Sequence, residues 1–558
     1  MKRLSPALLA LGVLSTGCPT GWRLERIEGE PASVDPHLWD DVHKTATAVR
    51  DATSDSTCGR ARRPLIHCAQ PSMKALCQSS PDERTALIGP TCSQFTSVLS
   101  FLHFSDAQLR EHRVHLAGPL SERQYDAFTG TVLRDPDLAR NDDAVLLATV
   151  LAANEIGALT DDVKAAFAPC NPPAPPRFAV HTGDAVDAGM FSELFTFLAD
   201  FGELDIPFYN VIGNHDGLLF GTFPPDRVSG LNVVAPYVPI LDADRFMRAH
   251  NVIGATYDLS VPAAPSREDR DWTAFGCSSK DWNGTTCASN PMPQSNYHGF
   301  DLACAAPLRG EGRAAHDALC PEARGYYALN IDVTVSGAPA RIRMIVLDTN
   351  EVVPESVTQG TLERSRGHVL PEQLRWLERQ LSAGPGEPPV FYLVFGHHPI
   401  DTFEDEDQAA ELRDLMLRNP RVLGYFVGHT HKDGFIKHPR AGGAPALWEL
   451  VAGSTLVFPQ LARVSELLED HGKLYLRVMS FRQQLGDSAV PQPPIRARRQ
   501  ACRALTLRAA RGRASAARDA RDADWTAEPI AAPRANGLLL VYDPDNANLG
   551  RPAEGQPQ

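Results

Sequence analysis

The hydrophobic residues of the chain gather in short apolar runs that are separated by longer polar stretches. Runs of four to eight residues, rich in β-branched and aromatic side chains, predict strands that are buried on both faces of a sheet. The six clearest strands are predicted at Val98–Phe104, Arg177–Thr182, Phe208–Ile212, Ile342–Leu347, Val390–Phe395 and Val422–Val427. Two further runs near the C-terminal end, Leu447–Ala452 and Leu474–Phe481, predict additional strands.

Two segments between these runs have the spacing of amphipathic helices. Phe191–Phe201 has a mainly apolar face, and a second segment begins at Pro371, a residue favoured in the first turn of a helix. Its leucines recur at helical spacing, at Leu370, Leu374, Leu377 and Leu381. Strands that alternate with helices predict an α/β architecture whose ligands gather at the carboxyl ends of the strands.

Polar residues with metal-binding side chains follow five of the six strands directly. Carboxylate, amide and imidazole groups suit borderline or hard divalent ions, and no cluster contains a cysteine thiolate. The sixth strand ends instead at Asp348-Thr349-Asn350. The five clusters are Asp106-Ala107-Gln108, Gly183-Asp184-Ala185-Val186-Asp187, Gly213-Asn214-His215-Asp216, Gly396-His397-His398-Pro399 and Gly428-His429-Thr430-His431.

This ordered series resembles the calcineurin-like metallophosphoesterase superfamily, whose motifs are DxH, GDxxD, GNH(D/E), an isolated His and GHxH. The resemblance covers roughly residues 98–482. It implies a four-layer α/β/β/α sandwich that hydrolyses small-molecule phosphoesters with two divalent ions, of which Mn, Fe or Zn are expected. Gln108 stands where the family pattern has His, although some members of the superfamily carry this DxQ variant.

The resemblance also implies a role for each residue of the clusters. Asp184 would bridge the two ions, which would generate a hydroxide nucleophile. His215 would act as general acid and Asp216 would orient it, whereas Asp187 is expected to order its loop. His398 is the alternative to His397 as a ligand. The implied ligands are Asp106, Gln108, Asp184 and His431 for one ion, and Asp184, Asn214, His397 and His429 for the other.

A binding protein that keeps the fold without turnover is the alternative hypothesis, and Gln108 is the residue that suggests it. Neither a GxSxG nucleophile elbow nor a P-loop occurs in the sequence. The formal net charge of -14 argues against nucleic acid as a partner, because a surface that follows phosphates needs excess Lys and Arg.

The first 18 residues resemble an export signal, with a basic start and an apolar segment, Leu4–Leu14, that is too short to cross a bilayer. They end at a lipobox-like Cys18, whose acylation would anchor the protein to a membrane; ordinary cleavage or a buried cysteine is the alternative. We therefore expect an exported protein of the periplasm, outer membrane or cell surface. The other ten cysteines are expected to form disulfides, whose connectivity the sequence does not give.

The same patterns divide the chain into four parts. Residues 1–18 form the signal segment, and residues 19–97 a Cys-bearing extension. Residues 98–482 form the metallophosphoesterase domain, which contains an insertion at about 217–324, and residues 483–558 form a Pro/Arg-rich tail.

Overall fold

The computed structural model describes two sheets, the helices that cover them and the loops at one end of their strands. The predicted signal segment with Cys18, all eleven cysteines and most of the extension, insertion and tail lie outside the described residues. The division into domains, the lipid anchor and the disulfides therefore stay predictions. The described residues are 64–66, 95–109, 142–159, 161, 163–164, 172–187, 191–216, 252–254, 272–274, 325–351, 366–384, 386–457, 460–483 and 537–545.

The first sheet is mixed and has seven strands. Its strands β2, β3 and β4 run parallel to one another, and β13 pairs antiparallel with both β2 and β14. The order is β1 (Pro64–Ile66), β14 (Lys473–Gln483), β13 (Ala462–Asp470), β2 (Thr96–Phe104), β3 (Ala179–His181) and β4 (Phe208–Asn210), with β15 (Gly537–Tyr542) also paired to β14. Strand β1 lies in the predicted extension and β15 in the predicted tail, so this sheet includes strands from outside the predicted domain, residues 98–482.

The second sheet is also mixed and has six strands. Strands β12, β10, β9 and β8 are parallel, and the two edge strands are antiparallel to their neighbours. The order is β11 (Gly434–His438), β12 (Leu447–Val451), β10 (Val422–Val427), β9 (Val390–Phe395), β8 (Ala338–Val346) and β7 (Tyr327–Val335). Strands β5 (Val252–Gly254) and β6 (Trp272–Ala274) form a separate two-stranded sheet.

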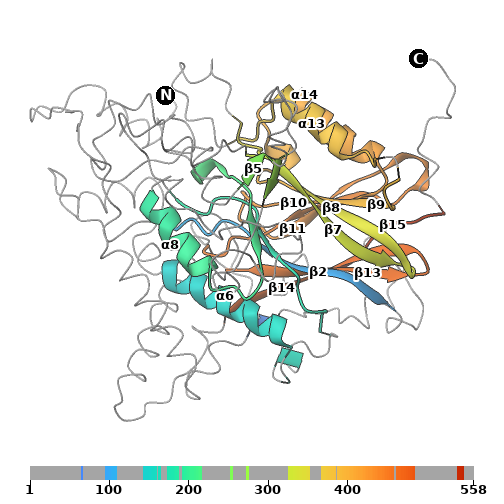
Figure 1. Ribbon diagram of the computed structural model, residues 1–558. Coiled ribbons are helices and arrows are strands. Elements are labelled where there is room, and N and C mark those ends of the chain that lie inside the picture. Colours follow the sequence, from blue (N-terminus) through green and yellow to red (C-terminus); the bar gives the residue numbers. More distant parts are fainter. Residues whose placement is uncertain are drawn as a thin grey trace, which may run out of the picture.

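Helices cover the outer sides of the two sheets (Figure 1). Helices α6 (Asp142–Ala158) and α8 (Phe191–Phe201) lie beside the first sheet, and α13 (Pro371–Gln380) and α14 (Glu406–Arg418) beside the second. The predicted α/β sandwich is confirmed, and both of its sheets are mixed. Among the described helices, none combines the length and the apolar character needed to span a membrane. Short 3₁₀ turns are η3 (Asn214–Asp216), η7 (Ile400–Thr402) and η8 (Ala441–Gly443).

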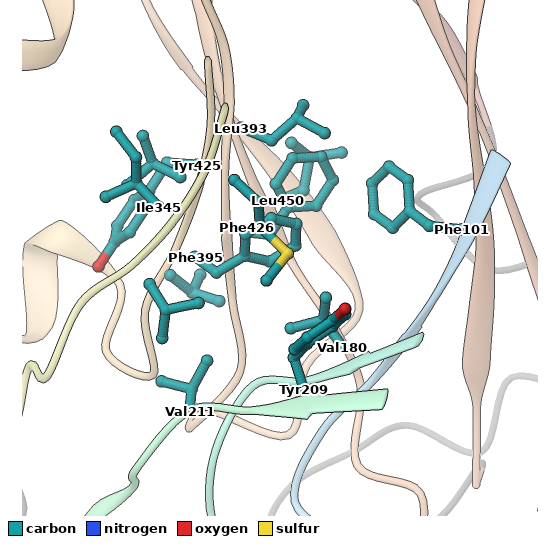
Figure 2. Packing of buried hydrophobic residues seen from close by; sticks show 14 of the residues in the cluster. Phe101, Val180, Tyr209, Val211, Ile345, Leu393, Phe395, Tyr425, Phe426 and Leu450 are labelled. Atoms are coloured by element: carbon teal, nitrogen blue, oxygen red, sulfur yellow. The ribbon is translucent and has the colours of Figure 1, made fainter. Parts of the chain in front are cut away.

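Aromatic rings on β2 join the layers because successive side chains of a strand point to opposite faces. The Phe101 ring faces the second sheet, with centroids 5.4 Å from Phe426 and 5.9 Å from Phe395. Phe104 points the other way and meets Phe201 of α8 at 5.1 Å. Figure 2 shows Phe101, Phe395 and Phe426 together in the packed core. Burying each ring contributes roughly 1.5–3 kcal/mol to the stability of the fold. This aromatic packing therefore fixes the positions of the loops at the ends of the strands.

Among the elements that the sequence analysis did not predict, two were missed because their burial hides the usual pattern. Helix α6 is buried on nearly every side that is described, so its apolar residues form no one-sided stripe. Strand β13 is equally buried but carries polar side chains such as Arg463, Ser465 and Glu466, which interrupt any apolar run. Arg463 Nε donates to Asp433 at 2.8 Å, so this buried charge has a partner.

Candidate metal centre

All five polar clusters meet at the ends of parallel strands, and both sheets contribute. The first sheet supplies the loops after β2, β3 and β4, and the second supplies the loops after β9 and β10. Side chains more than 300 residues apart in the chain come into contact, as the 3.2 Å separation of Asp106 Oδ1 and His431 Nε2 demonstrates. The site therefore depends on the packing of one sheet against the other.

Asp184 lies between two groups of predicted ligands. Its Oδ1 is 3.4 Å from His397 Nε2, and it accepts a hydrogen bond of 2.8 Å from the His215 amide. Its Oδ2 accepts a hydrogen bond of 3.0 Å from the side-chain amide of Gln108. The two oxygens of one carboxylate thus face different sets of side chains, which is the arrangement required of a bridging ligand.

The group on the Oδ1 side is built around Asn214. Its Oδ1 is 3.1 Å from His397 Nε2 and 3.1 Å from His429 Nδ1. Bonds of about 2.0–2.2 Å to one ion place its ligand atoms about 3 Å apart, so this spacing fits a shared ion. His397 Nδ1 is 2.7 Å from the Thr182 carbonyl oxygen, which can only accept. In the neutral imidazole that contact leaves the lone pair on Nε2, toward Asn214.

The group on the Oδ2 side contains Asp106, Gln108 and His431. Asp106 Oδ2 accepts from the Ser105 hydroxyl at 2.6 Å and from the His429 amide at 3.1 Å, while its Oδ1 faces His431. Gln108 Oε1 is buried and has no hydrogen-bond partner among the described residues. A buried amide oxygen without a partner is costly, and a divalent ion prefers such an oxygen, so these residues fit a metal ion.

His398 lies close to the same histidines. Three ring nitrogens, one each from His397, His398 and His429, lie within 4.8 Å of one another. The Asp106, Asp184 and His397 ligand atoms form a second such cluster. Proximity alone therefore does not decide between His397 and His398.

The predicted ligands hold unusual backbone conformations. Five of the nine described non-glycine residues with positive φ are predicted ligands. Left-handed backbone costs of order 1–3 kcal/mol at a non-glycine residue, and such strain concentrates at functional sites. No sequence pattern predicted it, although Asp tolerates this region better than most residues. The five are Asp106 (51°), Gln108 (41°), Asp184 (57°), His429 (66°) and His431 (57°).

Two glycines let the loops approach one another. Gly183 has a φ of +92°, and a Cβ placed on it would lie 2.5 Å from His397 Nδ1. A Cβ on Gly213 would overlap the Asp184 carboxylate. Larger side chains at these positions would push the ligands apart, which explains why glycine precedes the Asp and Asn of the two clusters.

Burial and mutual charge shift the pKa values in this centre. Burial alone would raise the pKa of Asp184, but His397 and His215 hold it well below its ordinary value. Burial would lower the pKa of His397, yet Asp184 raises it to about 9. Burial lowers the pKa of His429 to about 3, so this side chain is neutral, as a metal ligand must be. A cation beside Asp184 would take the place of the proton on His397.

The structure corrects the expected partner of His215. Its Nδ1 is 2.8 Å from the Asp187 carbonyl oxygen and 3.2 Å from the Asp187 carboxylate. Asp216, expected to orient His215, instead accepts backbone hydrogen bonds from Gly213 (2.7 Å), Asp184 (3.0 Å) and Val186 (3.1 Å). The 3₁₀ turn η3 turns the two adjacent side chains in different directions, so Asp216 ties loops together while Asp187 holds the imidazole.

Burial would lower the pKa of His215, but the carboxylates of Asp184 and Asp187 raise it above its ordinary value overall. The His215 side chain is 15% exposed, whereas that of Asp184 is 1% exposed. His215 therefore lies on the solvent side of the centre.

Comparison with protein families agrees with this geometry. The sequence profile described as calcineurin-like phosphoesterase matches residues 100–305. Over that segment the chain is similar to this family. The matched segment contains Asp106, Gln108, Asp184, Asn214 and His215. The remaining predicted ligands follow β9 and β10 beyond the match, and the contacts above join them to the same centre.

Solved structures give only weak similarities to this chain. A dimetal phosphatase from Danio rerio is 11% identical, covers 69% of this chain and 96% of its own, and has a TM-score of 0.34. GAP50, described as the anchor in the inner membrane complex of Plasmodium, is 12% identical, with coverages of 69% and 84% and a TM-score of 0.32. No curated protein sequence matches the chain. The similarity to the family therefore rests on the sequence profile and the motifs.

Proposed function

We propose that this chain is a metal-dependent hydrolase of small-molecule phosphoesters. The observation that carries the proposal is the position of Asp184, whose two carboxylate oxygens face two different groups of ligand side chains. Each group offers oxygen and imidazole donors of the kind that hold Mn, Fe or Zn. When bound, two such ions supply Lewis-acid stabilisation of the phosphoryl oxygens and activation of water at neutral pH.

The residues of the chain have separate tasks in this proposal. Asp106, Gln108 and His431 would hold one ion, Asn214, His397 and His429 would hold the other, and Asp184 would contribute to both sites. Ligands on rigid strand ends would keep both sites in fixed positions, which favours the alignment that an in-line displacement at phosphorus requires. The Gln108 amide oxygen replaces an imidazole and changes affinity or metal preference on its side of Asp184.

His215 protonates the departing oxygen of the substrate. Its Nδ1 lies against the Asp187 carbonyl oxygen, so Nδ1 keeps its hydrogen and the proton available for transfer is on Nε2. Partial exposure lets a substrate reach that nitrogen, while the carboxylates of Asp184 and Asp187 favour the protonated form. A positioned acid of this kind typically contributes about 10²- to 10⁴-fold in rate when the leaving group is a poor one.

The test compares two leaving groups in one variant. His215→Ala should keep its metal content, lose about 10²- to 10⁴-fold in turnover of alkyl phosphoesters, and lose much less on activated aryl esters. Asn214→Ala is the matched control, because it should lose metal and slow both substrates together. If His215→Ala slows alkyl and aryl esters by the same factor with metal bound, His215 is not the acid.

Metal analysis separates a hydrolase from a binding protein. Chelation should abolish turnover of an aryl and natural phosphoester panel, and Mn, Fe, Zn or Co should restore it to different degrees. A protein that binds metal but turns over none of these esters would support the binding alternative. Full activity after exhaustive removal of metal would exclude the proposed reaction.

The cellular location is a separate proposal, which rests on the sequence around Cys18. Acylation there would hold the exported enzyme at a membrane surface. Cys18→Ser should move the protein from the membrane fraction to the soluble exported fraction. A wild-type protein that is already soluble after export would refute the anchor and leave the phosphoesterase proposal intact.

A further inference from the structure

The strand-end residues Asp348-Thr349-Asn350, which follow β8, are the polar cluster that supplies no predicted ligand. Thr349 is fully buried beside the loop that follows β9. Its Oγ1 is 3.2 Å from the His397 amide nitrogen and 3.1 Å from the His398 amide nitrogen. The same oxygen is 2.9 Å from His398 Nδ1. One hydroxyl thus contacts both adjacent histidines.

The hydrogen-bonding capacity of a hydroxyl fixes the direction of these contacts. A threonine hydroxyl has one hydrogen to donate and two lone pairs that accept. The two backbone amides can only donate, so they occupy both lone pairs of Thr349 Oγ1. The hydroxyl hydrogen is then left for His398 Nδ1, which must accept it. A neutral His398 therefore carries its proton on Nε2 and has no lone pair there for a metal ion.

The neutral form of His397 is held in the opposite tautomer. Its Nδ1 donates to the Thr182 carbonyl oxygen at 2.7 Å, and its Nε2 lies 3.1 Å from Asn214 Oδ1. The loop has little freedom to exchange the two rings. The Tyr425 hydroxyl donates to the His398 carbonyl oxygen at 2.9 Å, and a Cβ on Gly396 would lie 3.0 Å from Thr349 Cγ2.

We propose that Thr349 is a positioning residue that locks His398 as the Nε2–H tautomer and reserves the metal position beside Asn214 for His397. The proposal rests on the proposed function in one respect, namely that a metal binds between Asn214, His397 and His429. The tautomer of His398 does not depend on metal, so the two ideas can be tested separately.

The first experiment measures histidine tautomers in the metal-free protein. Selective ¹⁵N labelling of histidine and long-range ¹H–¹⁵N correlation identify which ring nitrogen carries the proton, and His398→Gln assigns the signal. We expect Nε2–H for His398 in the wild type and in Thr349→Ser, which keeps the hydroxyl. Thr349→Val should shift His398 toward Nδ1–H. Thr149→Val, which removes a buried hydroxyl within α6, should leave the signal unchanged.

The second experiment titrates metal into the same proteins and records the visible spectrum of bound Co²⁺. Loss of a side chain that orients a metal ligand typically lowers metal affinity about 10- to 100-fold. We expect Thr349→Val to show this loss or an altered spectrum, and His398→Gln to bind like the wild type. The double variant Thr349→Val, His398→Gln should recover the wild-type spectrum, because the competing imidazole is gone.

Three outcomes would overturn the proposal. His398 could carry its proton on Nδ1 in the wild type, His398→Gln could lose the same metal that His397→Gln loses, or Thr349→Ser could behave like Thr349→Val. If Thr349→Val does not fold, the wild-type tautomer and His398→Gln still decide. A wild-type protein that binds no Co²⁺, Zn²⁺ or Mn²⁺ would refute the proposed function while leaving the tautomer assignment to the first experiment.

Discussion

Replacing Gly183 by alanine should damage both the fold and the metal centre. The residue has a φ of +92°, and its missing Cβ would lie 2.5 Å from His397 Nδ1, 2.8 Å from His397 Cγ and 3.0 Å from Gly213 Cα. Contacts of this kind normally begin near 3.4 Å, so the imidazole must move by about 1 Å. His397 is fully buried and cannot turn toward solvent.

The expected cost has two parts. Holding alanine in a left-handed conformation costs about 1–2 kcal/mol, and overpacking a buried site typically costs another 1–3 kcal/mol. We therefore expect Gly183→Ala to lower the free energy of unfolding by about 2–5 kcal/mol. Moving the His397 ring also breaks the contact with the Thr182 carbonyl oxygen, so metal affinity beside Asn214 should fall as well.

Substitutions at two other glycines distinguish the backbone cost from the packing cost. Gly337, in the turn between β7 and β8, has a φ of +76° with nothing within 4 Å of a built Cβ, so Gly337→Ala should cost only the backbone part. Gly157 lies in α6 with open space around it, and Gly157→Ala should stabilise the helix by roughly 0.5–1 kcal/mol.

Urea unfolding of the metal-free proteins, followed by fluorescence of the buried Trp376 and Trp448, gives the free energies, and metal titration gives the affinities. A Gly183→Ala protein no less stable than Gly337→Ala, with unchanged metal affinity, would refute the packing argument.

Three further changes test other contacts of the centre. Asp216→Ala leaves three buried backbone amides without an acceptor and should cost at least about 3 kcal/mol in urea unfolding; a loss below 1 kcal/mol would contradict its role as a tie between loops. Burial raises the pKa of Asp348 to about 7, so the folded protein binds the proton more tightly than the unfolded chain and loses stability as pH rises from about 4 to 7. As the pH rises from 5 to 8, the free energy of unfolding of the metal-free wild type should therefore fall by roughly 2–3 kcal/mol relative to that of Asp348→Asn. A parallel pH dependence of the two proteins would contradict this. Gln108→His should tighten metal binding or change metal preference in titrations, and an unaltered metal dependence would show that Gln108 is not a ligand.

Much of the architecture followed from the sequence because its buried strands are apolar without interruption. Strands β9 and β10 begin and end where the apolar runs do, and α8 has its predicted bounds. Helix α6 was missed because it is apolar on nearly every side. Strand β13 was missed because it carries polar side chains although it is buried. Strand β15 lies in the segment expected as a tail, and its apolar run GLLLVY was the one signal available.

The site followed the sequence less completely. Residue type and order brought Asp106, Asp184, Asn214 and the histidines together, because strand ends in parallel sheets converge. The partner of His215 did not follow, since the direction of a side chain in a three-residue turn depends on backbone angles that a motif does not encode. Thr349 was noted only as part of a polar strand end, and its three contacts depend on tertiary packing.

Because the predicted ligands are divided between the two sheets, metal binding would depend on complete folding of both. Neither half of the chain contains a full set of donors, so a protein that ends before β9 would still match the profile but would have the complete set of donors for neither ion. An ion held by residues from both sheets would also act as a cross-link that forms only in the complete fold. At a free concentration a hundred times its dissociation constant it would add about 2.7 kcal/mol to stability. Metal availability would then govern how long the protein survives as well as how fast it works.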